Sequence, residues 1–207
     1  SACRAGWLFE IFGHDLDKIY YLNTFPGYAK SHSDPNLVMK VHSYDTLLCS
    51  DIATAPSSLP PSDYKVSFDS SKVVLYEDLL ELVKTGAISE FNLIDARGAT
   101  RFTGEVEESR PGMSSGHIPG AINIPYTEVL TPAKGFLSAS SLKKIFKKSG
   151  IDETKPTIVS CGSGVTACVV RAAMQLAGYD SSKLAVYDGS WSEWALRAPK
   201  EFIVKSV

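Results

Sequence analysis

Short apolar segments alternate with amphipathic helical patterns from Leu75 to the C-terminus. Apolar runs of four or five residues between polar or turn-forming residues are typical of buried strands, whereas apolar positions three and four residues apart indicate helices. The alternation predicts an α/β fold, with a central parallel sheet flanked by helices on both faces. The predicted strands cover 91–95, 121–125, 157–160 and 184–187, and the predicted helices cover 77–84, 140–148 and 166–177.

The N-terminal part of the chain has a different pattern. Residues 4–13 carry an apolar helical stripe that ends on a glycine, and the apolar run at 19–22 predicts a short buried strand. Residues 24–72 are rich in Pro, Ser and Asp, with short strands expected at 38–42 and 64–68. An irregular stretch of this length is unusual inside one compact domain, so it predicts a connection between two domains.

An internal repeat relates the two ends of the chain. At an offset of 165 positions, the N-terminal helix falls on the helix predicted at 166–177. One helix and one strand cannot bury a core alone, so the repeat predicts a tandem duplication. The predicted segments are 1–30 as the second half of a first domain, 31–72 as a linker and 73–207 as an intact second domain. The identities are Ala2 with Ala167, Cys3 with Cys168, Gly13 with Gly178, Asp15 with Asp180, and Lys18 with Lys183.

Composition narrows the classes of partner. The formal net charge is −2, without the basic excess typical of nucleic-acid binding, so no direct nucleic-acid partner is expected. No apolar run approaches the roughly 20 residues that span a bilayer, so no membrane partner is expected. The chain has 4 cysteines and 4 histidines, and none has the spacing of a metal site or a disulfide framework. We therefore predict no metal, and a reducing compartment.

A glycine-rich loop follows the strand predicted at 157–160. Gly162 and Gly164 allow backbone angles that turn successive N–H groups inward, and the following helix adds its positive N-terminal dipole. Such a cradle stabilises a thiolate or a persulfide, and the carboxyl end of a strand is where ligands bind in open α/β sheets. The loop, Cys161-Gly162-Ser163-Gly164-Val165-Thr166, predicts that Cys161 is a nucleophile. The alternative is a buried structural thiol, a common fate of cysteine and the one expected for Cys168.

Together these motifs resemble the C-terminal domain of tandem rhodanese-type thiosulfate/3-mercaptopyruvate sulfurtransferases. The resemblance covers 73–207, and 1–30 resembles the second half of the inactive first domain of that family. It implies a rhodanese-like fold and a Cys161 persulfide intermediate that needs no cofactor. The motifs are Leu93-Ile94-Asp95-Ala96-Arg97, Gly116-His117-Ile118-Pro119-Gly120-Ala121, Cys161-Gly162-Ser163-Gly164-Val165-Thr166-Ala167 and Tyr187-Asp188-Gly189-Ser190-Trp191.

The resemblance also implies roles for individual residues. Members that prefer thiosulfate carry basic side chains directly after the cysteine, so the neutral Gly162 and Ser163 resemble the 3-mercaptopyruvate branch. Arg101 and Arg110 correspond to the arginines that hold the donor's carboxylate and keto groups, although a solvated surface charge stays open for Arg110. Ser163 relays a proton with partners from the first domain, so slow turnover is expected of this chain alone. The backbone of Gly162, Gly164, Val165 and Thr166 is expected to bind the anionic sulfur.

Structural roles are expected for the remaining motif residues. Asp95 and Asp188 brace loops, Arg97 serves structure or surface, His117 is a hydrogen-bonded turn residue, and Trp191 and Trp194 pack the C-terminal segment on the core.

The expected partners are a small sulfur donor and a thiol or sulfur-carrier protein acceptor, in a relay such as tRNA thiolation. The expected location is cytoplasmic or mitochondrial. Two alternatives stay open. One is a non-catalytic rhodanese-like binding module. The other is a cysteine-dependent phosphatase on the same fold, which would need an arginine where Ala167 stands.

Overall fold

The computed structural model describes residues 1–24, 27 and 63–206. Ser1–Tyr21 and Ser67–Val207 form one compact unit, and Leu22–Val66 form a second. In the described part of the second unit, the Gly27 N–H donates to Thr24 Oγ1 at 2.9 Å.

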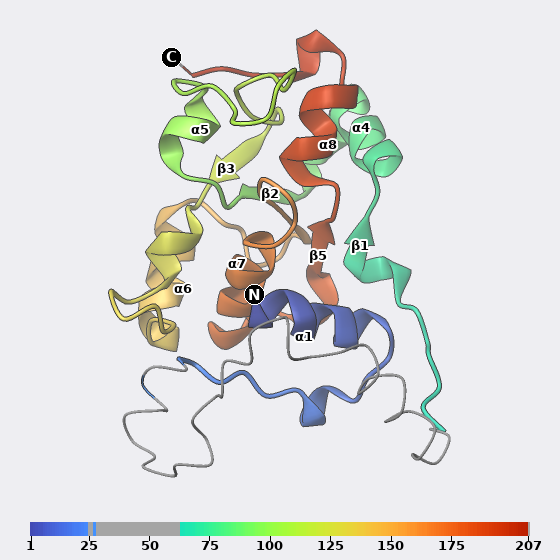
Figure 1. The fold of residues 1–207 in the computed structure, drawn as a ribbon, viewed down its shortest axis with the longest axis vertical. Coiled ribbons are helices and arrows are strands. Elements are labelled where there is room, and N and C mark those ends of the chain that lie inside the picture. The colour runs from blue at the N-terminus through green and yellow to red at the C-terminus, as the bar shows by residue number, and fades with distance from the viewer. Residues whose placement is uncertain (25–26, 28–62, 207) are drawn as a thin grey trace, which may run out of the picture. The chain divides into compact units, whose positions relative to one another are not determined.

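A five-stranded parallel sheet lies at the centre of the first unit, in the order β1-β5-β4-β2-β3 (Figure 1). The four strands predicted from apolar runs are confirmed, and β1 is an edge strand too short to be predicted from a pattern. The strands are β1 Val73–Val74, β2 Asn92–Asp95, β3 Ala121–Asn123, β4 Thr157–Ser160 and β5 Leu184–Tyr187.

The helices predicted from periodicity are also confirmed. The helix predicted at 140–148 begins slightly earlier, because Ser138 caps it by accepting the Ser141 N–H at 3.3 Å. The α-helices are α1 Ala2–Ile11, α4 Tyr76–Thr85, α5 Ala99–Thr103, α6 Ala139–Lys148, α7 Ala167–Leu176 and α8 Ser190–Arg197. The 3-10 helices are η1 Leu16–Lys18, η5 Ser70–Lys72, η6 Ala87–Glu90, η7 Tyr126–Val129, η8 Ser181–Lys183 and η9 Lys200–Phe202. No helix of the described residues is both long and apolar enough for a membrane span.

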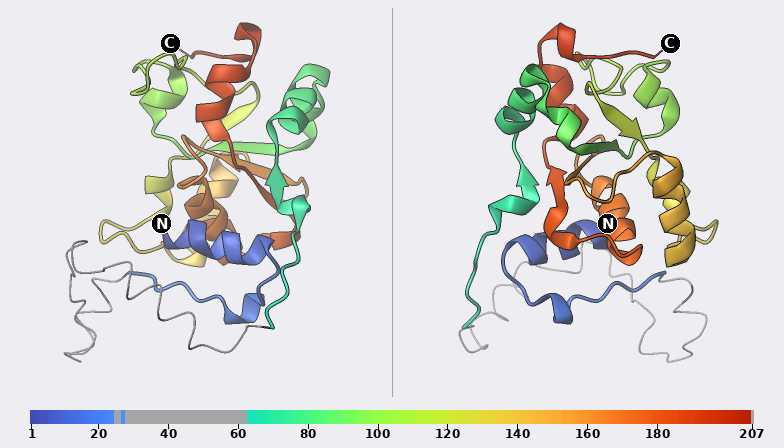
Figure 2. Two further views of the ribbon diagram at one scale, coloured as in Figure 1. Left: turned by 45° about the vertical axis from the view of Figure 1, so that its right-hand side comes forward. Right: turned by 180° about the vertical axis from the view of Figure 1, so that it is seen from behind.

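Helices cover both faces of the sheet, as the sequence predicts (Figure 2). Adjacent strand residues point to opposite faces. Ile94 and Val159 therefore pack with α1, α6 and α7, while Leu93 and Ile158 pack with α4 and α8. Each face thus has its own apolar core, and Trp191 and Trp194 are fully buried in the second, as expected.

The N-terminal helix α1 packs on α7 within this unit. Its residues Trp7 and Ile11 are buried, and the Glu10 carboxylate receives two hydrogen bonds of 2.7 Å from Arg171 and one of 2.8 Å from Lys72. Burial raises the pKa of Glu10, but the hydrogen bonds from Arg171 and Lys72 outweigh it and leave the pKa lowered. This buried network fixes α1 on the helix that comes after the cysteine loop.

Two predicted strands are wrong. Residues 19–22 are irregular, and Tyr20 is 86% exposed. Residues 64–68 are also irregular. An apolar run becomes a strand only where a neighbouring strand satisfies its backbone groups, and neither segment has one among the described residues. The strand predicted at 38–42 lies outside the described residues, and the division into 1–30, 31–72 and 73–207 stays a prediction.

Candidate active site

The sheet order places one crevice at the centre of its carboxyl edge. From β2 the chain crosses to β3 on one side, whereas from β4 it crosses to β5 on the other, so the order reverses between β2 and β4. Such a switch point is where open α/β sheets bind ligands. Asp95 ends β2 and Cys161 directly follows β4. Both predicted motifs therefore meet at this crevice.

The loop after β4 presents a row of backbone hydrogen-bond donors. Within the described part of the chain, no backbone N–H from Gly162 to Thr166 donates a hydrogen bond to another residue. Gly164 has a φ of 75°, a left-handed conformation that favours glycine, and α7 begins directly after Thr166. Free N–H groups at the start of a helix attract an anion. This geometry fits the predicted cradle for a thiolate or persulfide.

The start of α8 holds the cysteine loop in place. The Cys161 N–H donates to Ser190 Oγ at 3.2 Å, and the Trp191 and Ser192 N–H groups donate to the carbonyls of Cys161 and Gly162 at 2.9 and 3.0 Å. Ser190 has a φ of 53°, a strained conformation for a residue with a Cβ, and its hydroxyl donates to the Tyr187 carbonyl at 2.9 Å. The sequence motif contains Ser190 but does not predict this contact.

The Cys161 side chain lies at the floor of the loop. It is 1% exposed and packs with Ile94 and Ala96 in the core on the α7 face. Above the loop is a cavity of about 190 Å³ that Gly162 and Ser163 line, together with both predicted arginines. The complete lining is Arg101, Glu108, Ser109, Arg110, Met113, Gly162, Ser163 and Ser192. The cavity thus joins four of the predicted site residues. Its lining does not include the buried Cys161 side chain or Gly164, Val165 and Thr166.

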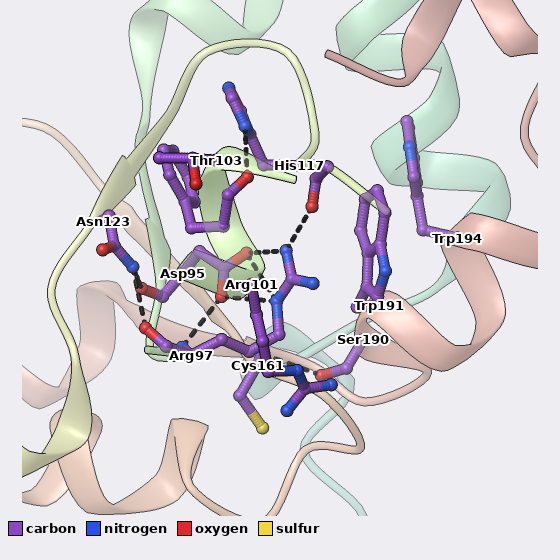
Figure 3. Close-up of polar contacts among 12 residues, drawn as sticks. Asp95, Arg97, Arg101, Thr103, His117, Asn123, Cys161, Ser190, Trp191 and Trp194 are labelled. Carbon is purple, nitrogen blue, oxygen red and sulfur yellow. Dashed lines mark hydrogen bonds and ion pairs between the residues drawn. The ribbon is translucent and has the colours of Figure 1, made fainter. Parts of the chain in front are cut away.

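Arg101 reaches the loop directly. Its guanidinium lies against Gly162, where a Cβ would stand 3.4 Å from Arg101 Nη2. The Arg101 side chain is 41% exposed, so it is open to a ligand in the cavity. Figure 3 shows this guanidinium beside the Cys161 backbone. A donor that Arg101 binds would therefore lie over the cysteine loop.

A buried carboxylate, Glu108, stands between two arginines. It accepts hydrogen bonds from Arg97 Nη1 at 2.9 Å and from Arg101 Nε at 3.3 Å, and its side chain is 2% exposed. Arg97 is itself buried. It donates to Asp95 at 2.6 Å and to the Gly116 carbonyl at 2.7 Å, and stacks on Trp191 (Figure 3). Arg97 thus has the structural setting expected of it, and Glu108, which no sequence motif singles out, fixes the direction of Arg101.

Two further residues have the expected settings. His117 Nδ1 lies 2.8 Å from the Phe102 carbonyl, and its ring stacks on Phe102, as befits a turn residue. Cys168 is buried on α7, and its thiol donates to the Gly164 carbonyl at 3.3 Å. Burial raises the pKa of Cys168 to about 12.

Among the described residues, no group of three or more His, Cys, Asp or Glu side chains is placed to hold a metal ion.

Arg4 is a residue beside the site that the sequence motifs do not include. It extends from α1, stacks on Trp7 and forms an ion pair with Asp188 at the end of β5. A Cβ on Gly164 would lie 2.8 Å from Arg4 Nη1 and 2.9 Å from the Asp188 carbonyl. The ion pair therefore closes off the back of the cysteine loop. No local pattern signals this contact, because the two partners are 184 residues apart.

The loop begins with a cysteine, presents backbone N–H groups that suit an anion, and lies at the switch point of a parallel sheet. This combination is typical of α/β proteins whose chemistry depends on a cysteine in such a loop. The chain belongs to the rhodanese family, whose rhodanese-like domain matches residues 75–197. The family resemblance of the sequence motifs and the predicted fold are both confirmed.

Similar proteins cover nearly the whole chain. It is 36% identical to 3-mercaptopyruvate sulfurtransferase of Mus musculus over 99% of this chain and 61% of that protein. It is 36% identical to thiosulfate sulfurtransferase TUM1 of Saccharomyces cerevisiae over 100% of this chain and 66% of that protein. The yeast mitochondrial complex I sub-stoichiometric sulfur transferase subunit has a similar structure, with a TM-score of 0.78 and 38% identity over 99% of this chain and 68% of that one. The chain spans about three-fifths of the length of the first of these relatives.

Proposed function

We propose that this protein is a sulfurtransferase that carries sulfur as a persulfide on Cys161, taking it from 3-mercaptopyruvate or, less well, from thiosulfate. The observation that carries the proposal is the row of unpaired N–H groups from Gly162 to Thr166 around the cysteine. A persulfide anion needs such donors, because a buried anion without hydrogen bonds is strongly disfavoured. The names of the similar proteins support the same activity.

In the first half-reaction, the Cys161 thiolate attacks the sulfur of 3-mercaptopyruvate. The carbon–sulfur bond breaks, its electron pair leaves with the carbon, and pyruvate enolate forms beside the Cys161 persulfide. Ser163, which lines the cavity, relays to the enolate the proton that the transferred sulfur carried as a thiol, so that pyruvate forms and the persulfide remains as an anion. The loop N–H groups stabilise the anionic sulfur throughout. No cofactor takes part.

The charges around the cavity favour a carboxylate donor over thiosulfate. The residues after the cysteine, Gly162 and Ser163, carry no charge. Glu108 pairs with Arg101 and offsets its charge. Arg110 forms no ion pair with the described residues, so it supplies the net positive charge of the cavity. A single net positive charge suits a monoanionic carboxylate better than the dianion thiosulfate. A guanidinium binds a carboxylate through two parallel hydrogen bonds.

The setting disfavours the two alternative functions. A phosphatase would need a guanidinium at position 167, where α7 begins with the buried Ala167. A binding module has no use for a cysteine under a row of free N–H groups. One similar protein is named as a yeast mitochondrial subunit, and we extend a mitochondrial or cytoplasmic location to this chain as part of the proposal. We also propose that the chain takes part in a sulfur relay, such as one that serves tRNA thiolation.

Mass spectrometry of the purified chain after incubation with 3-mercaptopyruvate tests the proposal. We expect one added sulfur atom, absent in Cys161→Ser and retained in the control Cys168→Ser. We also expect Arg101→Ala and Arg110→Ala to lower kcat/KM for 3-mercaptopyruvate by roughly 10- to 100-fold, the cost of a charged hydrogen bond. The same variants should lower kcat/KM for thiosulfate less. An unchanged kcat/KM for 3-mercaptopyruvate in both variants would show that the two arginines do not hold its carboxylate. A Cys161 without added sulfur would favour the non-catalytic binding module.

A further inference from the structure

A second and larger cavity adjoins the one above the cysteine loop. Its volume is about 640 Å³, within the range of small-molecule sites, and its walls are the loop at 107–115 and the C-terminal segment. Glu108, Arg110 and Met113 line both cavities, so the two adjoin at these side chains. Apart from Arg110 and Glu108, the proposed binding of 3-mercaptopyruvate involves none of the charged residues of the larger cavity.

The larger cavity carries an unbalanced positive charge. Arg110, Lys200 and Lys205 line it, and none of them forms an ion pair with the described residues. Of its two acidic lining residues, Glu108 is already paired with Arg97 and Arg101, which leaves Glu107 alone. The cavity therefore attracts a ligand with negative charge.

The two lysines are held in place by the fold. Val204 and His117 exchange backbone hydrogen bonds of 3.0 and 2.8 Å, and the Ser206 N–H donates to the Thr103 carbonyl at 2.9 Å. Lys205 is thus fixed on both sides, and its stem lies against Gly104, where a Cβ would stand 3.1 Å from Lys205 Cγ. Lys200 begins η9, which is anchored by a 2.9 Å hydrogen bond from Trp194 Nε1 to the Phe202 carbonyl.

We infer that the larger cavity binds the sulfur acceptor, and that this acceptor is a small thiol bearing at least one carboxylate. The inference rests on the proposed function, because it concerns the second half-reaction. Lys200 and Lys205 would hold the carboxylate while the acceptor thiolate enters past Arg110. The acceptor thiolate attacks the outer sulfur of the Cys161 persulfide, the sulfur–sulfur bond breaks, and Cys161 leaves as a thiolate. The product is the persulfide of the acceptor, so atoms and electrons balance.

The test compares two acceptors that differ chiefly in charge. Cys161 is first loaded with sulfur, and loading is confirmed by mass spectrometry. The rate of discharge is then measured with 3-mercaptopropionate, which is anionic, and with 2-mercaptoethanol, which is neutral. In Lys200→Gln/Lys205→Gln we expect the rate with 3-mercaptopropionate to fall roughly three- to tenfold, the worth of two exposed ion pairs, while 2-mercaptoethanol is unaffected. Lys144→Gln/Lys148→Gln, on the exposed face of α6, is the matched control for net charge and should change neither rate.

An equal fall with both acceptors, or no fall with either, would overturn the inference. A second measurement needs no sulfur on Cys161 and therefore separates this inference from the proposed function. Titration with succinate should shift the NMR signals of the Met113 and Ile203 methyl groups, which line the larger cavity, and the lysine double variant should lose the shift. Methyl signals that do not move in the unmodified protein would show that the cavity binds no carboxylate, whatever the state of Cys161.

Discussion

Two segments with the same local structure, 2–18 and 167–183, pack against each other in this molecule and are called here the first and second copies of the repeat. They differ in the segment that follows each copy. At the repeat offset of 165 positions, α1 coincides with α7 and η1 with η8, residue for residue. The glycines after the helices, Gly13 and Gly178, have φ angles of 83° and 89°. Yet the segment after η8 is the buried strand β5, whereas 19–22 after η1 is irregular. Helix, glycine and 3-10 turn are therefore set by local sequence, but a strand needs neighbours.

The two copies also divide their roles. The second copy has the cysteine loop in front of it, whereas the first copy supplies side chains that support this loop and its helix. Glu10 on α1 binds Arg171 on α7, and neither has an equivalent at the repeat offset, where Gln175 and Gly6 stand. Helix α1 thus supports α7, the helix that follows the predicted nucleophile's loop.

The largest predicted effect is the loss of stability when the buried Glu10–Arg171 ion pair is broken. Arg171→Leu should lower the free energy of unfolding by about 3–5 kcal/mol, because it leaves a buried carboxylate with Lys72 as its remaining partner. Urea unfolding at neutral pH measures the loss. Glu10→Leu/Arg171→Leu should recover most of it, since no charge is then left unpaired. A double variant as unstable as the single one would show that packing, and not the charge, is responsible.

The two glycines that end the repeated helices should respond differently. Both are left-handed, so an alanine costs about 1–2 kcal/mol at either position. At Gly13 the new Cβ would also lie 2.9 Å from Ser67 Cβ and 3.0 Å from the Ser67 carbonyl, whereas nothing lies within 4 Å at Gly178. Gly13→Ala should therefore destabilise more than Gly178→Ala in matched thermal unfolding. Equal losses of stability would mean that the 67–69 segment moves away from the new Cβ at no free-energy cost.

The third expected effect is on turnover. Arg4→Leu removes the ion pair with Asp188 behind Gly164, so the cysteine loop loses a support from α1. We expect kcat for sulfur transfer from 3-mercaptopyruvate to fall about tenfold, because small misplacements of reacting groups are costly. KM should change little, since Arg4 does not line the cavity. Arg4→Lys should recover part of kcat, and Lys18→Leu, on the exposed surface beyond α1, is the control. A rise in KM would point to a donor-binding role instead.

The sequence predicts best those features that depend on local pattern. The strand and loop from Thr157 to Thr166 are predicted by an apolar run, two glycines and a helical period, all within one short segment. The family resemblance placed Arg101 and Arg110, and the structure brings both to the loop. Their convergence is set by the topology, because parallel strands bring their carboxyl ends to one edge.

The features that the sequence does not predict depend on contacts between distant segments. Glu108 lies in an irregular stretch with no period to read, and its partners are set by the fold. Ser190 has a role only because β5 ends beside β4. The apolar run at 19–22 shows the converse, because the same pattern that gives β5 forms no strand without neighbours.

The smallest effect concerns the aspartates that cap the two repeated 3-10 turns. Asp180 accepts hydrogen bonds from the hydroxyl and the N–H of Ser182 at 2.7 and 2.9 Å, and these lower the pKa of Asp180. A carboxyl whose pKa is depressed on folding stabilises the protein above its unfolded-state pKa, and this stability is lost as the pH falls through the folded-state pKa. Asp180→Asn should therefore lower Tm slightly at neutral pH. The difference should shrink as the pH falls below about 4 and vanish only below the folded-state pKa of Asp180. The comparison is with Asp15, which accepts the Asp17 N–H at 3.1 Å but is followed by Leu16 and Asp17, with no hydroxyl like that of Ser182. We expect Asp15→Asn to lower Tm less than Asp180→Asn, although Asp15 also forms an exposed ion pair with Lys18 at 3.5 Å. An equal loss would show that the Ser182 hydroxyl adds no stability beyond that of the contacts of Asp15.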